Sequence, residues 1–113
     1  MTRPYIPNAG DLVWISFDPQ SSHEVARRRP VLVLSPSEYN RPTGLALTCP
    51  ITSRIKGYPF EVPIRGKRIE GVALADHVGS LDWRARQFVF VEQADDDVMD
   101  RVRTLLGTLL RIA

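Results

Sequence analysis

Residues 23–36, with the sequence HEVARRRPVLVLSP, change character halfway along. The first half is polar and ends in three consecutive arginines, whereas the second half is an apolar run over residues 31–34, bounded by prolines. Such a run predicts a buried strand. Guanidinium groups at the start of a fixed strand are suited to hold a phosphate, because their forked donors match its oxygens. The tract is also typical of a solvated loop that keeps a strand edge soluble, and taken alone it favours that simpler interpretation.

The length and composition narrow the class of protein. The chain has 113 residues, which predicts one domain over residues 1–113, and its 43% hydrophobic and 25% charged residues are ordinary for a soluble globular protein. No apolar run approaches the ~20 residues that cross a bilayer, and the first residues lack the apolar core of a signal peptide. Cys49 is the single cysteine, so it cannot form an intramolecular disulfide. These features predict a cytoplasmic protein.

The net charge of +2 is unevenly distributed along the chain. Residues 27–86 carry eleven lysines and arginines against five acidic residues, a net charge of +6, whereas residues 1–26 and 87–113 each carry a net charge of −2. A basic middle of this size indicates a polyanionic partner, of which nucleic acid is the commonest.

Five further segments are rich in β-branched and aromatic residues or alternate in polarity, and we expect strands at residues 12–17, 45–51, 60–65, 71–75 and 88–91. Pro50 is expected to break or bulge its strand, and Pro63 to place its strand at a sheet edge. Between the strands we expect loops at 20–29 and 52–59, a helical turn at 37–40, and tight turns at 42–44 and 66–68.

The C-terminal part has a different period. Apolar residues recur there at helical spacing: Val98, Val102, Leu105 and Leu109. Asp95 or Asp96 is suited to cap this helix, and Gly107 weakens it by roughly 1 kcal/mol relative to alanine, so packing must support it. Short strands followed by one amphipathic helix predict a mainly β fold, as a small, strongly bent sheet or partly open barrel with a C-terminal helix.

Several familiar chemistries are absent from the sequence. It contains no HExxH, CxxC, GxxxxGK[ST] or GxGxxG pattern, and the start of the helix explains the three adjacent carboxylates at 95–97 better than a metal site does. The two histidines, His23 and His77, lack the spacing of metal ligands. We therefore expect neither a metal nor a cofactor.

What is left is a set of basic, hydroxyl and proton-transferring side chains: His23, Glu24, Arg29, Thr52, Ser53, Lys56 and Tyr58. Such a set suits metal-free phosphoryl transfer on RNA, in which the 2′-hydroxyl is the internal nucleophile. An arginine then neutralises charge on the pentavalent phosphate and a threonine hydroxyl donates to a phosphate oxygen. Phe17, Tyr58 and Trp83 offer faces for base stacking.

Each aromatic candidate has a simpler interpretation as well. Phe17 at a strand end suits either the core or RNA, and Tyr58 before Pro59 also suits the packing of a turn. The tetrapeptide WRAR at 83–86 fits an interface or a nucleic-acid patch, and its spacing does not decide. We expect Trp14 and Cys49 in the core, and His77 in a structural or surface role.

The chain resembles the MazF/PemK family of bacterial toxins over nearly its whole length. The resemblance rests on many short segments in the same order: YIPNAGDLVWISFDP at 5–19, RPVLVLSP at 29–36, Tyr39-Asn40, Thr43-Gly44, KGYPFEV at 56–62, GVALAD at 71–76 and WRAR at 83–86. The match is looser over residues 49–55, and Arg27 and Arg28 make the preceding loop more basic than the commonest pattern.

The resemblance implies a small SH3-like β-barrel with a C-terminal helix, assembled as a homodimer. It implies a metal-independent, sequence-specific endoribonuclease that cuts single-stranded RNA to 2′,3′-cyclic phosphate and 5′-hydroxyl ends, and a MazE-like antitoxin with an acidic tail. The catalytic residues would be Arg29, Thr52 and Glu24. The residues expected to bind RNA are Phe17, His23, Arg27, Arg28, Ser53, Lys56, Tyr58 and Arg86.

Two other functions stay open at this point. Related CcdB-like toxins bind DNA gyrase and cut nothing, and in that case the C-terminal helix would form the contact surface. An inactive member that binds only RNA or antitoxin would keep all of these motifs. The pair of Arg29 and Thr52 argues for the nuclease.

Overall fold

The computed structural model of the chain describes residues 4–16 and 28–112. Within these ranges the elements are β1 (Asp11–Ser16), β2 (Arg28–Val33), α1 (Ser37–Thr43), β3 (Leu45–Thr52), β4 (Glu61–Arg65), β5 (Glu70–Leu74), β6 (Gly79–Asp82), β7 (Val89–Gln93) and α2 (Asp96–Leu110). Neither described helix has the length and apolar character needed to cross a membrane. The predictions for Phe17, His23, Glu24 and Arg27 lie outside the described residues.

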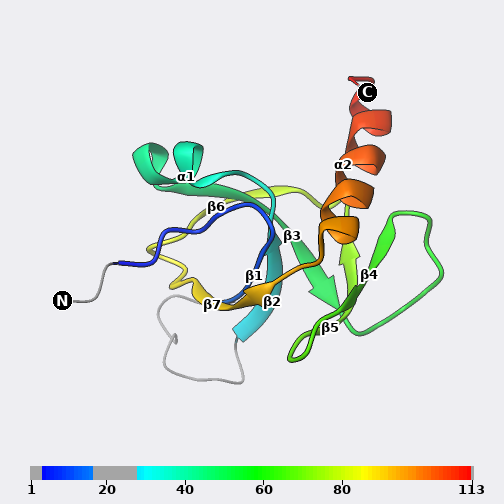
Figure 1. Cartoon of the computed structure of the whole chain (residues 1–113), viewed down its shortest axis with the longest axis horizontal. Helices are drawn as coiled ribbons and strands as arrows, with labels where there is room; N and C mark the ends of the chain where they lie inside the picture. Colours follow the sequence, from blue (N-terminus) through cyan, green and yellow to red (C-terminus); the bar gives the residue numbers. More distant parts are fainter. Residues whose placement is uncertain (1–3, 17–27, 113) are drawn as a thin grey trace.

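The strands form one antiparallel sheet in the order β4-β5-β3-β2-β1-β7, and β6 also pairs with β3. The strand β3 joins the whole sheet together. Its first half pairs with β6, its middle with β2, and its last two residues with β5. The sheet is therefore strongly curled, with α2 standing against it at one end (Figure 1). The predicted mainly β fold with a C-terminal helix is confirmed, and Pro63 lies on the edge strand β4 as expected.

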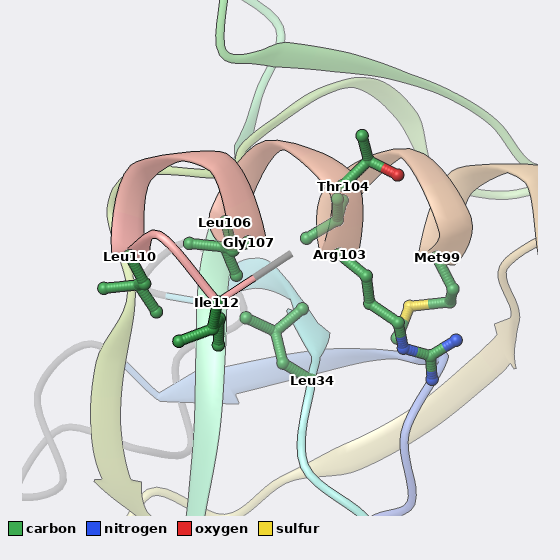
Figure 2. A pocket seen from close by; sticks show the side chains of 9 residues that line it. Leu34, Met99, Arg103, Thr104, Leu106, Gly107, Leu110 and Ile112 are labelled. Carbon is green, nitrogen blue, oxygen red and sulfur yellow. The ribbon is translucent and has the colours of Figure 1, made fainter.

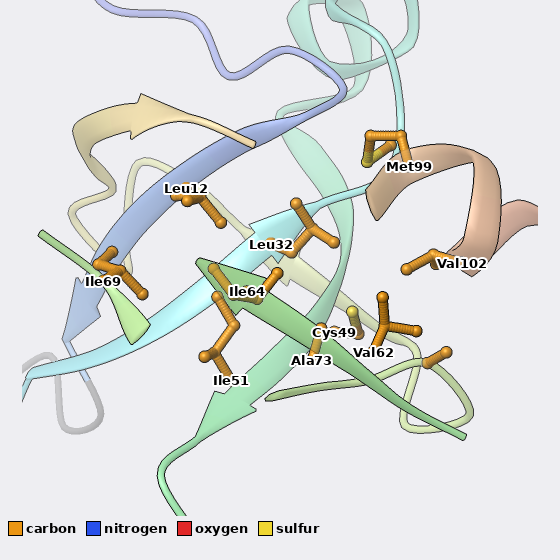
Figure 3. Close-up of a cluster of buried hydrophobic side chains, with 11 residues drawn as sticks. Leu12, Leu32, Cys49, Ile51, Val62, Ile64, Ile69, Ala73, Met99 and Val102 are labelled. Carbon is orange, nitrogen blue, oxygen red and sulfur yellow. The ribbon is translucent and has the colours of Figure 1, made fainter. Parts of the chain in front are cut away.

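The central strands are buried on both faces, which explains their continuous apolar sequences. Leu12 of β1 pairs with Leu32 of β2, and both belong to the core cluster that α2 covers with Met99 and Val102 (Figure 3). The next pair along, Val13 and Val31, points to the opposite face and joins a second cluster.

That second cluster contains Trp83, which is only 5% exposed. Its indole N–H donates to the backbone oxygen of the buried Asn40 at 2.8 Å. The Asn40 amide also donates to the backbone oxygens of Pro7 and Ser35, at 2.8 and 2.9 Å. These bonds join α1, the N-terminal segment and the turn after β6. Trp83 is thus a core residue, and the expectation that it offers a stacking face for RNA is wrong.

Four local predictions need correction. The strand β2 begins at Arg28, not at residue 31, because Arg28 and Arg29 pair with Ser16 and Ile15 of β1. The helix α1 extends through Pro42, where we expected a turn, and ends at Thr43, because the next residue, Gly44, has a left-handed φ of 70°.

The strand β3 runs through Pro50 without a break. On one side Pro50 pairs with Val31, and on the other side the partner changes from β6 to β5 between Thr48 and Ile51. The helix α2 starts after Asp95, as expected, but the Asp95 side chain makes no capping hydrogen bond. Gly107 is buried within α2 and lies in the lining of the groove beside this helix.

Candidate functional site

Arg29 and Thr52 stand at the same end of the β2–β3 pair. Val31 of β2 pairs with Pro50 of β3. Arg29 lies two residues before Val31, and Thr52 lies two residues after Pro50. Positions related in this way share a face of an antiparallel pair. Arg29 is exposed, and its Nη1 donates to the backbone oxygen of Arg28 at 3.2 Å. The hydroxyl oxygen of Thr52 accepts from the N–H of Arg54 at 3.1 Å, and a hydroxyl that accepts in this way still has its own hydrogen to donate.

Two more arginines gather at this end of the sheet around Ser16, the last residue of β1. On one side Ser16 pairs with Arg28. On the other side its N–H donates to the backbone oxygen of Arg86 at 2.9 Å, and Nη1 of Arg86 reaches the Ser16 oxygen at 3.5 Å. The sheet therefore holds three predicted site arginines at one end.

The segment after Thr52 is held by a carboxylate. Glu61 accepts the backbone N–H groups of Lys56, Gly57 and Tyr58, at 3.0, 3.0 and 3.2 Å. Three such bonds fix a segment that has no regular secondary structure of its own. Ser53 and Lys56 are exposed on it, as RNA-binding residues must be.

The phenol of Tyr58 is fixed as well. Its hydroxyl donates to Oδ2 of Asp76 at 2.5 Å, and this bond raises the pKa of Tyr58 above its usual value. Its ring lies 5.7 Å from the ring of Phe60, centroid to centroid. A hollow of about 420 Å³ opens beside Tyr58 and is lined by Thr52, Arg54, Lys56, Tyr58, Glu61, Leu74 and His77.

The comparisons with known proteins agree with this geometry. A family model described as a PemK-like, MazF-like toxin of type II toxin–antitoxin systems matches residues 8–110. The chain belongs to this toxin family. The resemblance predicted from its motifs is thereby confirmed.

Individual relatives give the same result. The endoribonuclease toxin MazF of Escherichia coli K12 is 52% identical over 86 residues, which cover 76% of this chain and 78% of the relative. The endoribonuclease PemK of Escherichia coli is 32% identical over 106 residues, covering 89% and 80%. The crystal structure of MazE–MazF (Form-II) from Deinococcus radiodurans superposes with a TM-score of 0.87 at 49% identity, covering 97% of this chain and all of that one. The two Escherichia coli relatives are endoribonucleases, as the resemblance implied, and the fold of the present chain is MazF-like.

The predicted site residues of this MazF-like chain fall into two groups. The structure brings Arg28, Arg29 and Arg86 together at one end of the sheet, and it places Thr52 and Tyr58 on the same hollow. Ser53 and Lys56 lie on the exposed segment after Thr52, and Lys56 also lines this hollow. The other four, Phe17, His23, Glu24 and Arg27, lie outside the described residues.

Sequence reasoning missed two residues that organise the site, Glu61 and Asp76. Both fall inside motifs that carried the resemblance, KGYPFEV and GVALAD, but nothing in their spacing indicated which groups they hold. Burial raises the pKa of the Cys49 thiol to about 12, so this thiol stays protonated and packs as the core residue that we expected. No group of three or more His, Cys, Asp or Glu among residues 4–16 and 28–112 is arranged to hold a metal ion.

Gly71 of β5 is expected to be required for the placement of Thr52. It has a φ of +137°, and a Cβ at this position would lie 2.4 Å from the backbone oxygen of Thr52. We predict that Gly71→Ala pushes the end of β3 away, destabilises the protein by at least about 2 kcal/mol, and slows RNA cleavage. Denaturant unfolding and single-turnover cleavage measure the two effects.

Gly79→Ala is the matched control. Gly79 lies in β6, and a Cβ there meets no atom within 4 Å. This variant should keep both stability and cleavage. Equal behaviour of the two variants would show that the close approach to Thr52 is unimportant.

Proposed function

We propose that this chain is the toxin of a type II toxin–antitoxin system and a metal-independent, sequence-specific endoribonuclease. It cuts single-stranded RNA, mRNA above all, to 2′,3′-cyclic phosphate and 5′-hydroxyl ends, and thereby inhibits translation and growth. The observation that carries the proposal is the position of Arg29 and Thr52 at one end of the β2–β3 pair, on a MazF-like fold. An mRNA substrate puts the enzyme in the cytoplasm.

The chemistry follows from these two side chains. The 2′-hydroxyl oxygen attacks the adjacent phosphorus, the bond to the 5′-oxygen breaks, and the cyclic phosphate forms. Charge builds up on the phosphate oxygens, where the Arg29 guanidinium neutralises it and the Thr52 hydroxyl donates a hydrogen bond. One proton leaves the 2′-oxygen and one reaches the departing 5′-oxygen, and we assign this transfer to Glu24.

The RNA backbone is expected to cross the basic end of the sheet. Arg28 and Arg86 flank Ser16 there, and Ser53 and Lys56 follow Thr52 on the neighbouring segment. Phosphate contacts of this kind fix the position of the strand and make binding sensitive to salt. Phe17, His23 and Arg27 belong to the same proposal through the resemblance.

The homodimer is proposed through α2. A groove lies between this helix and Leu34, and Met99, Leu106, Leu110 and Ile112 line it (Figure 2). Leu110 and Ile112 are 62% and 74% exposed, which is unusual for side chains of this size at a free surface. A second copy covering this face explains their exposure, and the resemblance implies such a dimer.

An antitoxin is the second partner. The Deinococcus radiodurans relative was crystallised as a MazE–MazF complex, and this supports antitoxin binding by the present chain. We propose a MazE-like protein whose acidic tail covers the arginines at the end of the sheet. Attraction between the two charge patterns predicts association that weakens as salt rises.

Arg29→Ala is predicted to reduce RNA cleavage by at least about 100-fold, the scale of losing one group that stabilises developing charge. Arg29→Lys should restore little of the cleavage rate, because one ammonium group cannot replace the forked donors of the guanidinium. The assay is single-turnover cleavage of a long single-stranded RNA in EDTA, with the chemistry of both new ends mapped. Arg41→Ala, an exposed arginine on α1, is the control and should cut normally. Wild-type rates in Arg29→Ala would remove Arg29 from the mechanism, and an inactive wild-type protein would disprove the proposed function.

Thr52→Val is predicted to slow the same reaction by about 10- to 100-fold, since it removes the hydroxyl but keeps the shape. Thr52→Ser should recover most of the rate because it restores the O–H donor. Both variants should unfold at a temperature close to that of the wild type. An unchanged rate in Thr52→Val would show that the hydroxyl takes no part.

Leu110→Asp is predicted to convert the dimer to monomers, because it introduces a charge into the apolar face of α2. Sedimentation equilibrium gives the mass directly. Thr108→Asp places the same charge on the same helix outside the lining of the groove, and should leave the dimer intact. Dimers of unchanged affinity in Leu110→Asp would place the contact elsewhere.

A further inference from the structure

The hollow beside Thr52 has the dimensions of a small-molecule site. Its volume of about 420 Å³ lies within the range of roughly 300–1,000 Å³ that is usual for ligand pockets. Leu74 supplies apolar surface to it, and Arg54, Lys56 and His77 supply basic groups. Because Thr52 belongs to the same lining, a group bound here would lie next to the phosphate that is cut.

Tyr58 lines this hollow, and its hydroxyl is not free. The hydroxyl is engaged by Asp76, while 43% of the residue surface stays exposed. An aromatic face that is held at its far end loses little freedom when a second ring stacks on it. Stacking on such faces is how proteins hold the bases of single-stranded RNA.

Asp76 lies at a fixed place in the backbone, and its side chain accepts a hydrogen bond from Tyr58. The preceding residue, Ala75, donates its N–H to the backbone oxygen of Phe60 at 2.9 Å, which ties the end of β5 to the Tyr58 segment. The Asp76 side chain is 19% exposed. Its Oδ2 accepts from Tyr58, whereas the buried Oδ1 has no hydrogen-bond partner among the described residues and lies 3.8 Å from Nε2 of His77.

The one carboxylate in the lining does not repel a nucleotide strongly. Glu61 accepts three backbone N–H groups of the Lys56–Gly57–Tyr58 segment, so its charge is already compensated. The same bonds fix the backbone under the Tyr58 ring. The hollow is therefore formed before any ligand arrives.

We propose that this hollow holds a nucleobase next to the cleaved phosphate, stacked on Tyr58, and that Asp76 is the positioning residue that keeps the Tyr58 ring in place. The inference rests on the proposed function and adds to it the group that reads the RNA beside the cut. It makes Tyr58 and Asp76 contributors to the choice of cleavage site.

The test uses short RNAs that contain the site cut by the wild-type protein. One 2′-deoxy sugar at the cut prevents the reaction, and a series of such RNAs lacks one base at each nucleotide flanking the cut. Removal of the stacked base should weaken binding by the wild-type protein about 5- to 140-fold, the usual contribution of one stacked base. Tyr58→Ala should bind the intact RNA more weakly than the wild-type protein by a similar factor. Removal of that base should then not change the affinity of this variant.

The role of Asp76 is tested with Tyr58→Phe, Asp76→Ala and the double variant. Each single change removes the hydrogen bond but keeps the ring, so each should reduce the effect of base removal by about twofold or more, and the double variant should be no worse than either. A merely structural role of Asp76 would lower the unfolding temperature without changing the effect of base removal. Tyr39→Ala is the control, because Tyr39 is a tyrosine of similar exposure, 40%, on α1 at the other end of β3.

The outcomes are distinct. If the wild-type protein cuts RNA but binds all base-deleted RNAs equally well, the nucleobase site is wrong and the proposed function stands. If base removal still weakens binding by Asp76→Ala as much as by the wild-type protein, and the losses of affinity in Tyr58→Phe and Asp76→Ala add in the double variant, the positioning role of Asp76 is wrong. If the wild-type protein cuts no RNA, the proposed function and this inference fail together.

Discussion

The position of the whole site depends on β2, which pairs with β1 on one side and with β3 on the other. Its residues Val31, Leu32 and Val33 are almost completely buried and serve both core clusters in turn. Burial of each such side chain stabilises the fold by roughly 1.5–3 kcal/mol, so the strand cannot leave its place without loss of the core. The arginines at its beginning are therefore part of a firmly held strand. A side chain that neutralises developing charge needs such a fixed position.

The curvature of the sheet has a related function. Since β3 pairs with β6, β2 and β5 in succession, it carries Thr52 to the end where β2 begins. Pro50 lies in the part of β3 where the partner on one side changes, and a residue without an N–H is tolerated well at such a position. The close approach of Gly71 to the Thr52 backbone then fixes the last residue of β3. Two segments that are distant in sequence thus meet through the pairing of one strand.

Local sequence patterns predicted the strands and the C-terminal helix but not their full extent. A loop was expected at Arg28 and Arg29 because charged residues are uncommon in buried strands. Pairing with Ser16 and Ile15 of β1 nevertheless places both residues in a strand. The strand β6 was not predicted, since it has four residues, is half exposed and, within the described part of the chain, pairs with β3 alone. Trp83 was offered as a stacking face because an isolated tetrapeptide carries no information on burial. Asp76 and Glu61 were missed for a similar reason, as a carboxylate that binds backbone N–H groups or a phenol has no signature in its spacing.

Three of the carboxylates are held in place by hydrogen bonds within the chain. Glu61 is occupied by three backbone N–H groups, Asp76 by Tyr58, and Glu92 by the N–H groups of residues 67–69 at 2.9–3.0 Å. The last set of bonds lowers the pKa of Glu92, with the bond from Arg68 as the largest cause. Each of these carboxylates keeps its charge and accepts hydrogen bonds from the backbone or from a neighbouring phenol. The basic side chains beside these turns, Lys56, Lys67 and Arg68, are exposed, whereas Glu61, Asp76 and Glu92 are partly buried, so at these turns a polyanion reaches the positive charges more easily.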